Sequence, residues 1–178
     1  VVFPGFEIAS NDKTHYVCLF PEDTTVQQLD RYLGNLKLHD PADGIRPSRL
    51  SSEELIEEVD LLGGFIYAAH CTQDSGLLKN RLNHVWKHPK LRAAQIPGPI
   101  DDLTSVEGDF YRKVFLNKDD SYRRERPMAA INAKDVAKPD DLEQPGASCF
   151  IKMTRPNFAA FKVAFLDPGS RIRLNSQQ

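Results

Sequence analysis

The sequence predicts an α/β fold in which helices alternate with short strands that are buried on both faces. The run Phe65–Ala69 is almost wholly apolar, and it follows a helix-like segment that Gly63-Gly64 would end. Such strands are typical of parallel sheets covered by helices on both sides. A polar residue, His70, comes directly after the run, where α/β barrels place their chemistry. With 178 residues and 40% apolar composition, we expect one domain over 1–178 with a full hydrophobic core.

The first 20 residues predict a β-hairpin. The apolar runs Val1–Ile8 and Tyr16–Phe20 are typical of strands, and Asn11–Lys13 supplies turn-forming residues between them. Glu7 lies inside the first run, so we expect it to be buried and paired. His15 precedes the second run, and an acid beside an imidazole forms half of a metal site or of an acid–base pair. Because the chain begins without Met, on strand residues, we expect an N-terminal part of the domain to be missing.

Helices are predicted by apolar residues at helical spacing, together with residues that start and stop helices. Ser51 followed by Glu54 is a capping pattern for one of them. In a basic helix, His84 and His88 lie four residues apart, a spacing that can bind metal. Lys87 lies nearby and no glutamate accompanies them, so a solvated basic face is expected instead. The predicted helices cover 26–36, 51–62, 77–88, 110–116 and 156–166, with a turn or short helix at 139–142.

Strands are predicted at further short apolar or alternating runs bounded by proline, glycine and charged residues. They cover 65–70, 91–96, 127–132, 148–153 and 171–174. A proline- and glycine-containing loop is expected over 37–50, where His39 is expected to be solvated. Asp135 follows the strand 127–132 and is a second acid at a strand end.

Composition and charge narrow the function classes. Twenty-three basic and 25 acidic side chains give a formal charge of −2, which argues against a dedicated nucleic-acid binder. No apolar run approaches the roughly 18 residues that a membrane span needs, and no signal-peptide pattern opens the chain. Cys18, Cys71 and Cys149 are widely spaced, as free thiols in a reducing compartment would be. We therefore expect a cytoplasmic protein without a membrane partner.

Four candidate ligands share one property. Glu7, His15, His70 and Asp135 each lie at or beside the end of a predicted buried strand, and a barrel gathers such ends on one face. Two carboxylates and two imidazoles are a ligand set for Zn²⁺, Mn²⁺ or Fe²⁺. Two alternatives stay open: His15 could be a simply exposed hairpin histidine, and Asp135 could cap the following helix. Cys71 is expected to be inert, because adjacent residues on a strand face opposite ways.

The candidate ligands and their surroundings resemble a known family. Gly5–Ile8 followed by His15, then Ala68–His70, then Ile131–Asp135, look like the later metal-binding motifs of the polymerase and histidinol phosphatase (PHP) superfamily. Other segments look like the PHP-type part of TrlF-type proteins, which join it to an AAA or SMC-like ATPase. These segments are Leu77–Lys79, Ala93–Gly98, Tyr122–Pro127 and Pro145–Cys149.

The resemblance implies a distorted (β/α)₇ TIM-like barrel of PHP type, present here as its C-terminal portion. It implies a cluster of divalent metals, manganese, zinc or iron, at the C-terminal strand ends. Glu7 would bridge metals, His15, His70 and Asp135 would each bind one, and Glu7, His70 and Asp135 would form the catalytic set. The implied activity is that of a metal-dependent phosphoesterase, a hydrolase acting on a phosphorylated small molecule, a nucleotide or a nucleic-acid end, within an ATPase-linked protein.

Two departures from the family pattern weaken the implied site. The opening His-x-His motif is absent, and Ala137 stands where the last motif, acid-x-His, has its histidine. We therefore expect low metal occupancy in this fragment. The alternative is a degenerate, non-catalytic PHP-like scaffold or regulatory domain for an attached ATPase. The chain has no phosphate-binding glycine loop, so that ATPase would lie outside these residues.

Three arginines precede the strand 127–132. Arg123, Arg124 and Arg126 could bind substrate phosphate through bidentate contacts. For any single one, we favour a solvated helix end paired with an acid among Asp119, Asp120 and Glu125. A nucleic-acid contact module built on 79–92 and 123–126 is a third option, which the overall charge disfavours.

Overall fold

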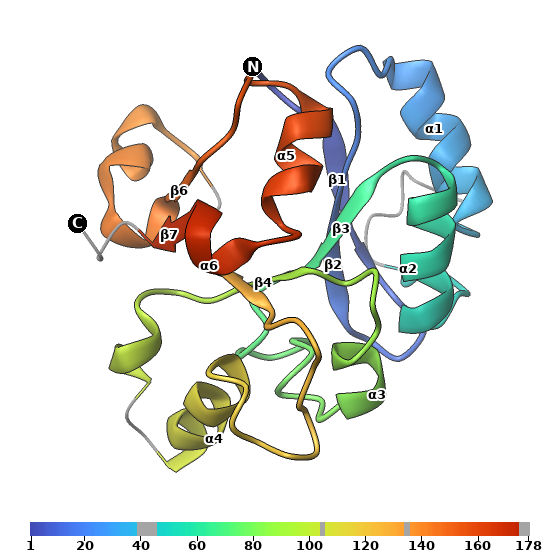
Figure 1. The fold of residues 1–178 in the computed structure, drawn as a ribbon. Coiled ribbons are helices and arrows are strands. Elements are labelled where there is room, and N and C mark those ends of the chain that lie inside the picture. The colour runs from blue at the N-terminus through green and yellow to red at the C-terminus, as the bar shows by residue number, and fades with distance from the viewer. Residues whose placement is uncertain (39–45, 104–105, 134–135, 175–178) are drawn as a thin grey trace.

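A computed structural model describes residues 1–38, 46–103, 106–133 and 136–174, and its main feature is a five-stranded mixed sheet (Figure 1). The strands follow the order β1-β2-β3-β4-β5. β1 (Gly5–Ala9) and β2 (His15–Leu19) form the expected hairpin, and β2 also pairs antiparallel with β3 (Phe65–Ala68). β4 (Ala93–Gln95) and β5 (Ala129–Ile131) extend the sheet in parallel with β3.

The α/β class is therefore confirmed, whereas a closed barrel is not seen. The sheet formed by the described residues is open, with β1 at one edge and β5 at the other. Positions predicted as strands are confirmed but are shorter, for example Ala93–Gln95 within 91–96. The parallel part still brings the ends of β3, β4 and β5 to one edge, as the argument from α/β folds requires.

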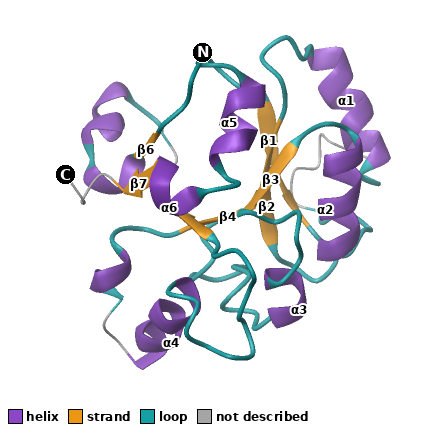
Figure 2. Cartoon of the chain, in the orientation of Figure 1, coloured by secondary structure: helices purple, strands orange, loops and turns teal. Residues whose placement is uncertain are grey.

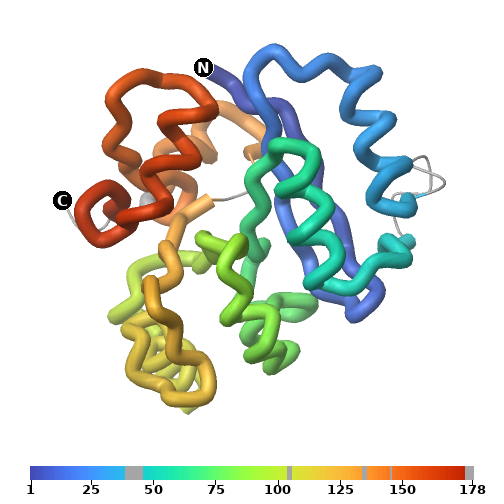
Figure 3. Tube along the Cα trace, turned by 45° about the vertical axis from the view of Figure 1, so that its right-hand side comes forward, coloured from blue at the N-terminus to red at the C-terminus, as the bar shows by residue number. Residues whose placement is uncertain are grey.

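Helices cover both faces of the sheet. α1 (Val26–Asn35) and α2 (Ser52–Leu61) lie on one face, and α5 (Phe158–Ala164) lies on the other, as Figures 1 and 3 show. Capping boxes begin both α1 and α2, at Thr25 and Ser51, where each side chain accepts a backbone N–H of the first turn.

The alternation of side chains along β3 creates two apolar cores. Ile66 and Ala68 face the larger core, which α2 closes with Leu55, Ile56 and Val59. Phe65 faces the smaller core. Aromatic side chains of α5 and of the residue that follows it fill that core against the short strands: Phe158, Phe161 and Phe165.

The C-terminal part adds short elements beside the main sheet. β6 and β7 form a separate antiparallel pair, which lies next to α6 in Figure 2. α4 begins four residues earlier than predicted. The bounds are Val106–Phe115 for α4, Cys149–Ile151 for β6, Pro168–Arg171 for α6 and Ile172–Leu174 for β7. Single 3₁₀ turns cover Ile100–Asp102, Pro139–Glu143 and Pro145–Ala147.

The predicted helix over 77–88 is wrong in most of its length. Only α3 (Asn83–Trp86) is helical, and the residues before it form turns. The backbone N–H groups of Leu78 and Lys79 donate to the carbonyl of Cys71, which pulls the chain back to the end of β3. Arg81 then has a φ of 58°, which no right-handed helix allows.

Two sequence expectations concern residues outside the described ranges. His39 and Asp135 both lie there. None of the helices in the described ranges combines the length and the apolar character that a membrane crossing requires.

Candidate metal centre

The hairpin register brings Glu7 and His15 together. Ala9 pairs with His15 across the two strands, so Glu7, two residues before Ala9, projects from the same face as a diagonal neighbour. Glu7 Oε1 lies 2.9 Å from His15 Nδ1. The pairing that the turn residues predicted is thus present, and it links the carboxylate directly to an imidazole.

His70 joins this pair from the end of β3. Its Nε2 lies 3.7 Å from the same Glu7 Oε1, and its ring centroid lies 5.1 Å from that of His15. One ligand atom from each of the three side chains lies within 4.8 Å of the other two. A carboxylate and two imidazoles therefore converge on one small volume.

The loop after β3 holds His70 in an uncommon backbone conformation. His70 has a φ of 25°, which is rare for a residue with a side chain. The loop returns over it: a Cβ placed on Gly76 would lie 2.5 Å from the His70 carbonyl oxygen, so a larger residue does not fit. The backbone N–H of His15 donates to Ser75, and that of Ala69 donates to His15. Backbone bonds thus tie His15 to Ala69 and Ser75, which flank His70 in the chain.

Gln95, at the end of β4, supports the site and was missed from the sequence. Its Oε1 accepts the backbone N–H of His70 at 3.0 Å, and its Nε2 donates to the carbonyl of Ala133 at 2.6 Å. One side chain therefore connects the ends of three neighbouring strands. The signal was available, because Gln95 is a polar residue that ends an apolar strand, the same feature that selected His70.

The expectation that Glu7 is buried is wrong. Its side chain is 44% exposed, while His15 and His70 are 35% and 25% exposed. The adjoining Ile8 is buried instead, since alternate residues of β1 face the core. All three side chains are thus partly exposed to solvent.

The buried thiol of Cys71 lies next in the chain and takes no part in the site. Cys71 is fully buried, and burial in apolar surroundings raises the pKa of its thiol.

The three side chains offer the donor types of a divalent metal site, and both separations from Glu7 are short enough for one ion. Two imidazoles and one carboxylate form protein ligand sets for zinc and for non-haem iron. Two ligands of one ion, each at about 2.0–2.2 Å, lie at most about 4.4 Å apart. Separations of 2.9 Å and 3.7 Å from Glu7 to the two histidines fall within that limit.

The two ring nitrogens of His70 lie in different surroundings. Nε2 faces Glu7 and is the atom that would bind the ion. Nδ1 is buried and has no hydrogen-bond partner among the described residues, and an ion held by Nε2 would leave it unpaired.

The fourth candidate ligand, Asp135, is not described, but the chain before it reaches the same edge. Ala133 accepts the hydrogen bond from Gln95 that was noted above, and Asn132, which is buried, donates to the carbonyls of Ile96 and Gly98. Ala137 is exposed, and its N–H donates to Asp141 in a turn. Its side chain is a methyl group, which offers no ligand atom.

The three arginines lie at the other end of the sheet. Arg124 donates to the carbonyls of His88 and Leu91, before β4, and all three arginines precede β5. The parallel register places the metal cluster after these strands. The structure thus does not bring the arginines to Glu7, His15 and His70.

The three arginines differ in what they contact. Arg123 forms an exposed ion pair with Asp120 at 2.7 Å, as the favoured alternative expected. Arg124 bonds backbone carbonyls in place of acids, and burial lowers its pKa to about 10. Arg126 is exposed.

The expectation of a solvated His88 is wrong. The His88 side chain is only 12% exposed, and its Nε2 lies 3.1 Å from Glu57 Oε1. Its Nδ1 accepts the N–H of Lys90. His84 is exposed, so the two histidines do not form a joint site.

Comparison with known proteins gives one structural likeness. No family model matches the chain, and no curated protein matches it in sequence. The fold is similar to the crystal structure of the novel lesion-specific endonuclease PfuEndoQ from Pyrococcus furiosus, with a TM-score of 0.58 and 15% sequence identity. The match covers 92% of this chain, which spans 38% of the length of the endonuclease chain. At this identity the likeness concerns the fold.

Proposed function

We propose that the intact protein is a metal-dependent phosphoesterase that hydrolyses phosphodiester bonds in nucleic acid or nucleotides. The convergence of Glu7, His15 and His70 at the ends of neighbouring strands carries the proposal. The likeness to a structure described as a lesion-specific endonuclease supports a nucleic-acid substrate, because endonucleases cleave phosphodiester bonds.

The residues of the centre have separable roles in this proposal. His15 and His70 would hold the ion through ring nitrogens. Glu7, whose carboxylate lies close to both rings, would be the third ligand. A bound divalent ion neutralises charge on the phosphoryl oxygens and lowers the pKa of water to about 7. The half-exposed Glu7 leaves one side of the centre open to a substrate.

Further parts of the proposal come from the resemblance to the PHP superfamily. Asp135 would be a fourth ligand, the metal would be manganese, zinc or iron, and the open sheet would be part of a (β/α)₇ barrel. An ATPase domain in the same protein would accompany it. The path of the chain through Ala133 to the edge of the sheet supports the role of Asp135.

A non-catalytic scaffold is the second candidate, because Ala137 offers no ligand atom where the family motif has histidine. A scaffold would keep the fold and bind metal weakly or not at all.

Hydrolysis of bis(p-nitrophenyl) phosphate and of a labelled oligonucleotide, with and without Mn²⁺, separates the two candidates. We expect turnover that Mn²⁺ stimulates, and its loss in Glu7→Gln and in His70→Ala. His84→Ala is the matched control, because this histidine is exposed on α3 and outside the cluster. Absence of both metal and stimulated turnover in the wild type would establish the scaffold instead.

A further inference from the structure

A basic pocket lies at the end of the sheet opposite the metal centre. It has a cavity volume of about 400 Å³, and it is lined by the segments that precede β4 and β5 and by the end of α5. Its charged lining consists of five basic side chains and one acidic one: Lys87, Arg92, Arg123, Arg124, Arg126 and Glu125. In a chain of net charge −2, this is a strong local excess of positive charge.

Some of the basic side chains already bond other parts of the protein, and others are free to bind a ligand. Arg124 acts as a brace because it links three backbone carbonyls: Nη2 donates to those of His88 and Leu91 at 3.1 Å and 2.7 Å, and Nε donates to that of Arg126. Its buried Nη1 has no acceptor among the described residues. The exposed pair with Asp120 occupies Arg123.

Three cations remain without a partner. Within the described residues, the side chains of Lys87, Arg92 and Arg126 form no hydrogen bond or ion pair. Like charges gathered in one pocket favour the binding of an anion, and the single acid of the lining, Glu125, forms no ion pair with any of the three. Arginine forks match the geometry of phosphate oxygens in particular.

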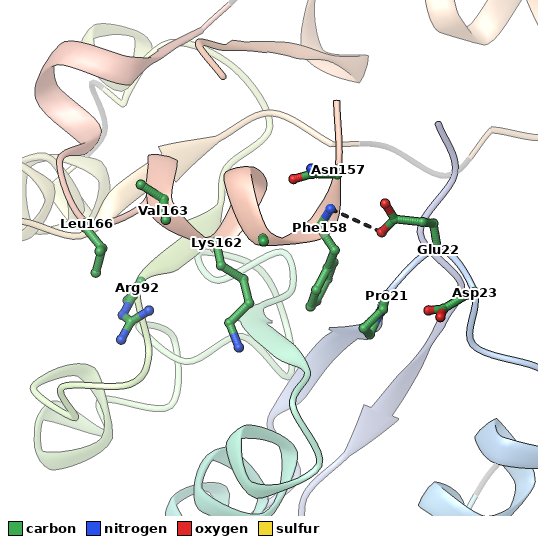
Figure 4. A pocket seen from close by; sticks show the side chains of 10 residues that line it. Pro21, Glu22, Asp23, Arg92, Asn157, Phe158, Lys162, Val163 and Leu166 are labelled. Carbon is green, nitrogen blue, oxygen red and sulfur yellow. Dashed lines mark hydrogen bonds between the residues drawn. The ribbon is translucent and has the colours of Figure 1, made fainter. Parts of the chain in front are cut away.

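A mostly apolar pocket, whose lining also includes the acids Glu22 and Asp23, continues from the basic one. The two pockets share Arg92 and Leu166, and the second has a cavity volume of about 800 Å³. Figure 4 shows Lys162 extending from α5 and Arg92 extending from the separate segment that precedes β4, with Pro21 farther along. Val163 and Leu166 are 48% and 41% exposed there. A cationic pocket beside an apolar one suits a nucleotide unit, whose phosphate is charged and whose base has an apolar face.

We propose that the basic pocket binds a backbone phosphate of a nucleic-acid strand, apart from the metal centre. The identity of the carrier, nucleic acid, rests on the proposed function; the preference for phosphate rests on the pocket alone. The basic pocket and the metal centre lie at opposite ends of the parallel β-strands. The pocket would therefore hold the nucleic acid and take no part in its hydrolysis.

Fluorescence anisotropy with a labelled single-stranded oligothymidine, in metal-free buffer with EDTA, tests the pocket. The test variant is Arg92→Glu combined with Arg126→Glu. The matched control is Arg31→Glu combined with Arg49→Glu, which changes the net charge equally at exposed positions away from the pocket. Circular dichroism and urea unfolding verify that both variants fold.

We expect the test variant to bind about tenfold more weakly at low salt, and the control to bind like the wild type. The slope of log K against log salt should become shallower by about 1.4, because each contact with a single strand contributes about 0.7. Equal weakening of both variants, or wild-type binding by the test variant, would overturn the proposal. So would competition by inorganic phosphate at the same molar concentration as the strand, which would make this a site for free anions.

The two proposals fail separately. Glu7→Gln should bind the oligonucleotide as the wild type does while losing Mn²⁺-stimulated hydrolysis. A wild type that binds the strand through the pocket but never hydrolyses it contradicts only the proposed function. Hydrolysis that persists in a test variant with unchanged strand affinity contradicts only the pocket.

Discussion

The two ends of the central sheet carry opposite chemistry. Where β3 finishes, Glu7, His15 and His70 present ligand atoms for a cation. Where β4 and β5 begin, basic side chains such as Arg92 and Arg126 surround a pocket suited to an anion. Among the parallel strands β3, β4 and β5, residues just before a strand and residues just after one lie at opposite ends of the sheet, so they cannot serve the same site.

The largest expected effect is the loss of Zn²⁺ affinity when a ligand is removed at the metal end of the sheet. His70→Ala removes one of three ligands, so we expect the Zn²⁺ affinity to fall by about 100-fold or more, beyond what loss of an outer partner costs. Isothermal titration calorimetry measures it. His84→Ala should bind as the wild type does; equal losses in both variants would show that zinc binds elsewhere.

The second effect concerns the stability of the basic end. Arg124→Met leaves the carbonyls of His88 and Leu91 without their donor, so we expect the free energy of unfolding to fall by about 2 kcal/mol. Urea denaturation measures the loss. Arg123→Met breaks only an exposed pair and should change stability by less than about 0.5 kcal/mol. If the two variants are equally destabilised, Arg124 is not a brace.

Gln95 provides a smaller test at the metal end. Gln95→Ala removes the acceptor of the His70 N–H and the donor to Ala133, so we expect Zn²⁺ affinity to fall by about tenfold, or about 1.4 kcal/mol. Gln27→Ala, an exposed position on α1, is the control. An unchanged affinity in Gln95→Ala would mean that the backbone alone positions His70.

The smallest effect distinguishes a structural acid from a ligand acid in the same hairpin. Burial raises the pKa of Asp12, but hydrogen bonds from Ser10 and Ser52 lower it further, so the net pKa lies below its usual value. The stability that Asp12 contributes is therefore present above its usual pKa and is lost as the pH falls through the folded pKa.

Asp12→Asn should accordingly make the free energy of unfolding depend less on pH below about pH 4, where carboxylates titrate. Urea denaturation across that range measures it, with Asp30→Asn on the exposed face of α1 as control. A pH dependence identical to that of the wild type would contradict the structural role.

Local chemistry explains which parts of the fold the sequence could predict. Capping boxes at Thr25 and Ser51 set the starts of α1 and α2, and the turn residues set the hairpin register that makes His15 a diagonal neighbour of Glu7. The helix over 77–88 failed because tertiary bonds to Cys71 outweighed helical spacing.

The candidate metal site also combines features that the sequence could predict with features that it could not. Strand ends predicted that His70 would meet Glu7, since this needs only the order of the sheet. The exposure of Glu7 and the bridging role of Gln95 depend on which face of each strand is covered by other elements. The spacing of residues along the sequence does not give that information. The arginines were predicted to bind substrate phosphate because they lie next to a strand in the sequence. They precede that strand, so they lie at the end of the sheet opposite to Glu7, His15 and His70.

Anomalous X-ray diffraction from crystals soaked in Zn²⁺ tests the central claim most directly. We expect one strong peak about 2.0–2.2 Å from a carboxylate oxygen of Glu7 and a ring nitrogen of each of His15 and His70. A peak elsewhere, with these three side chains unliganded at saturating zinc, would contradict the account.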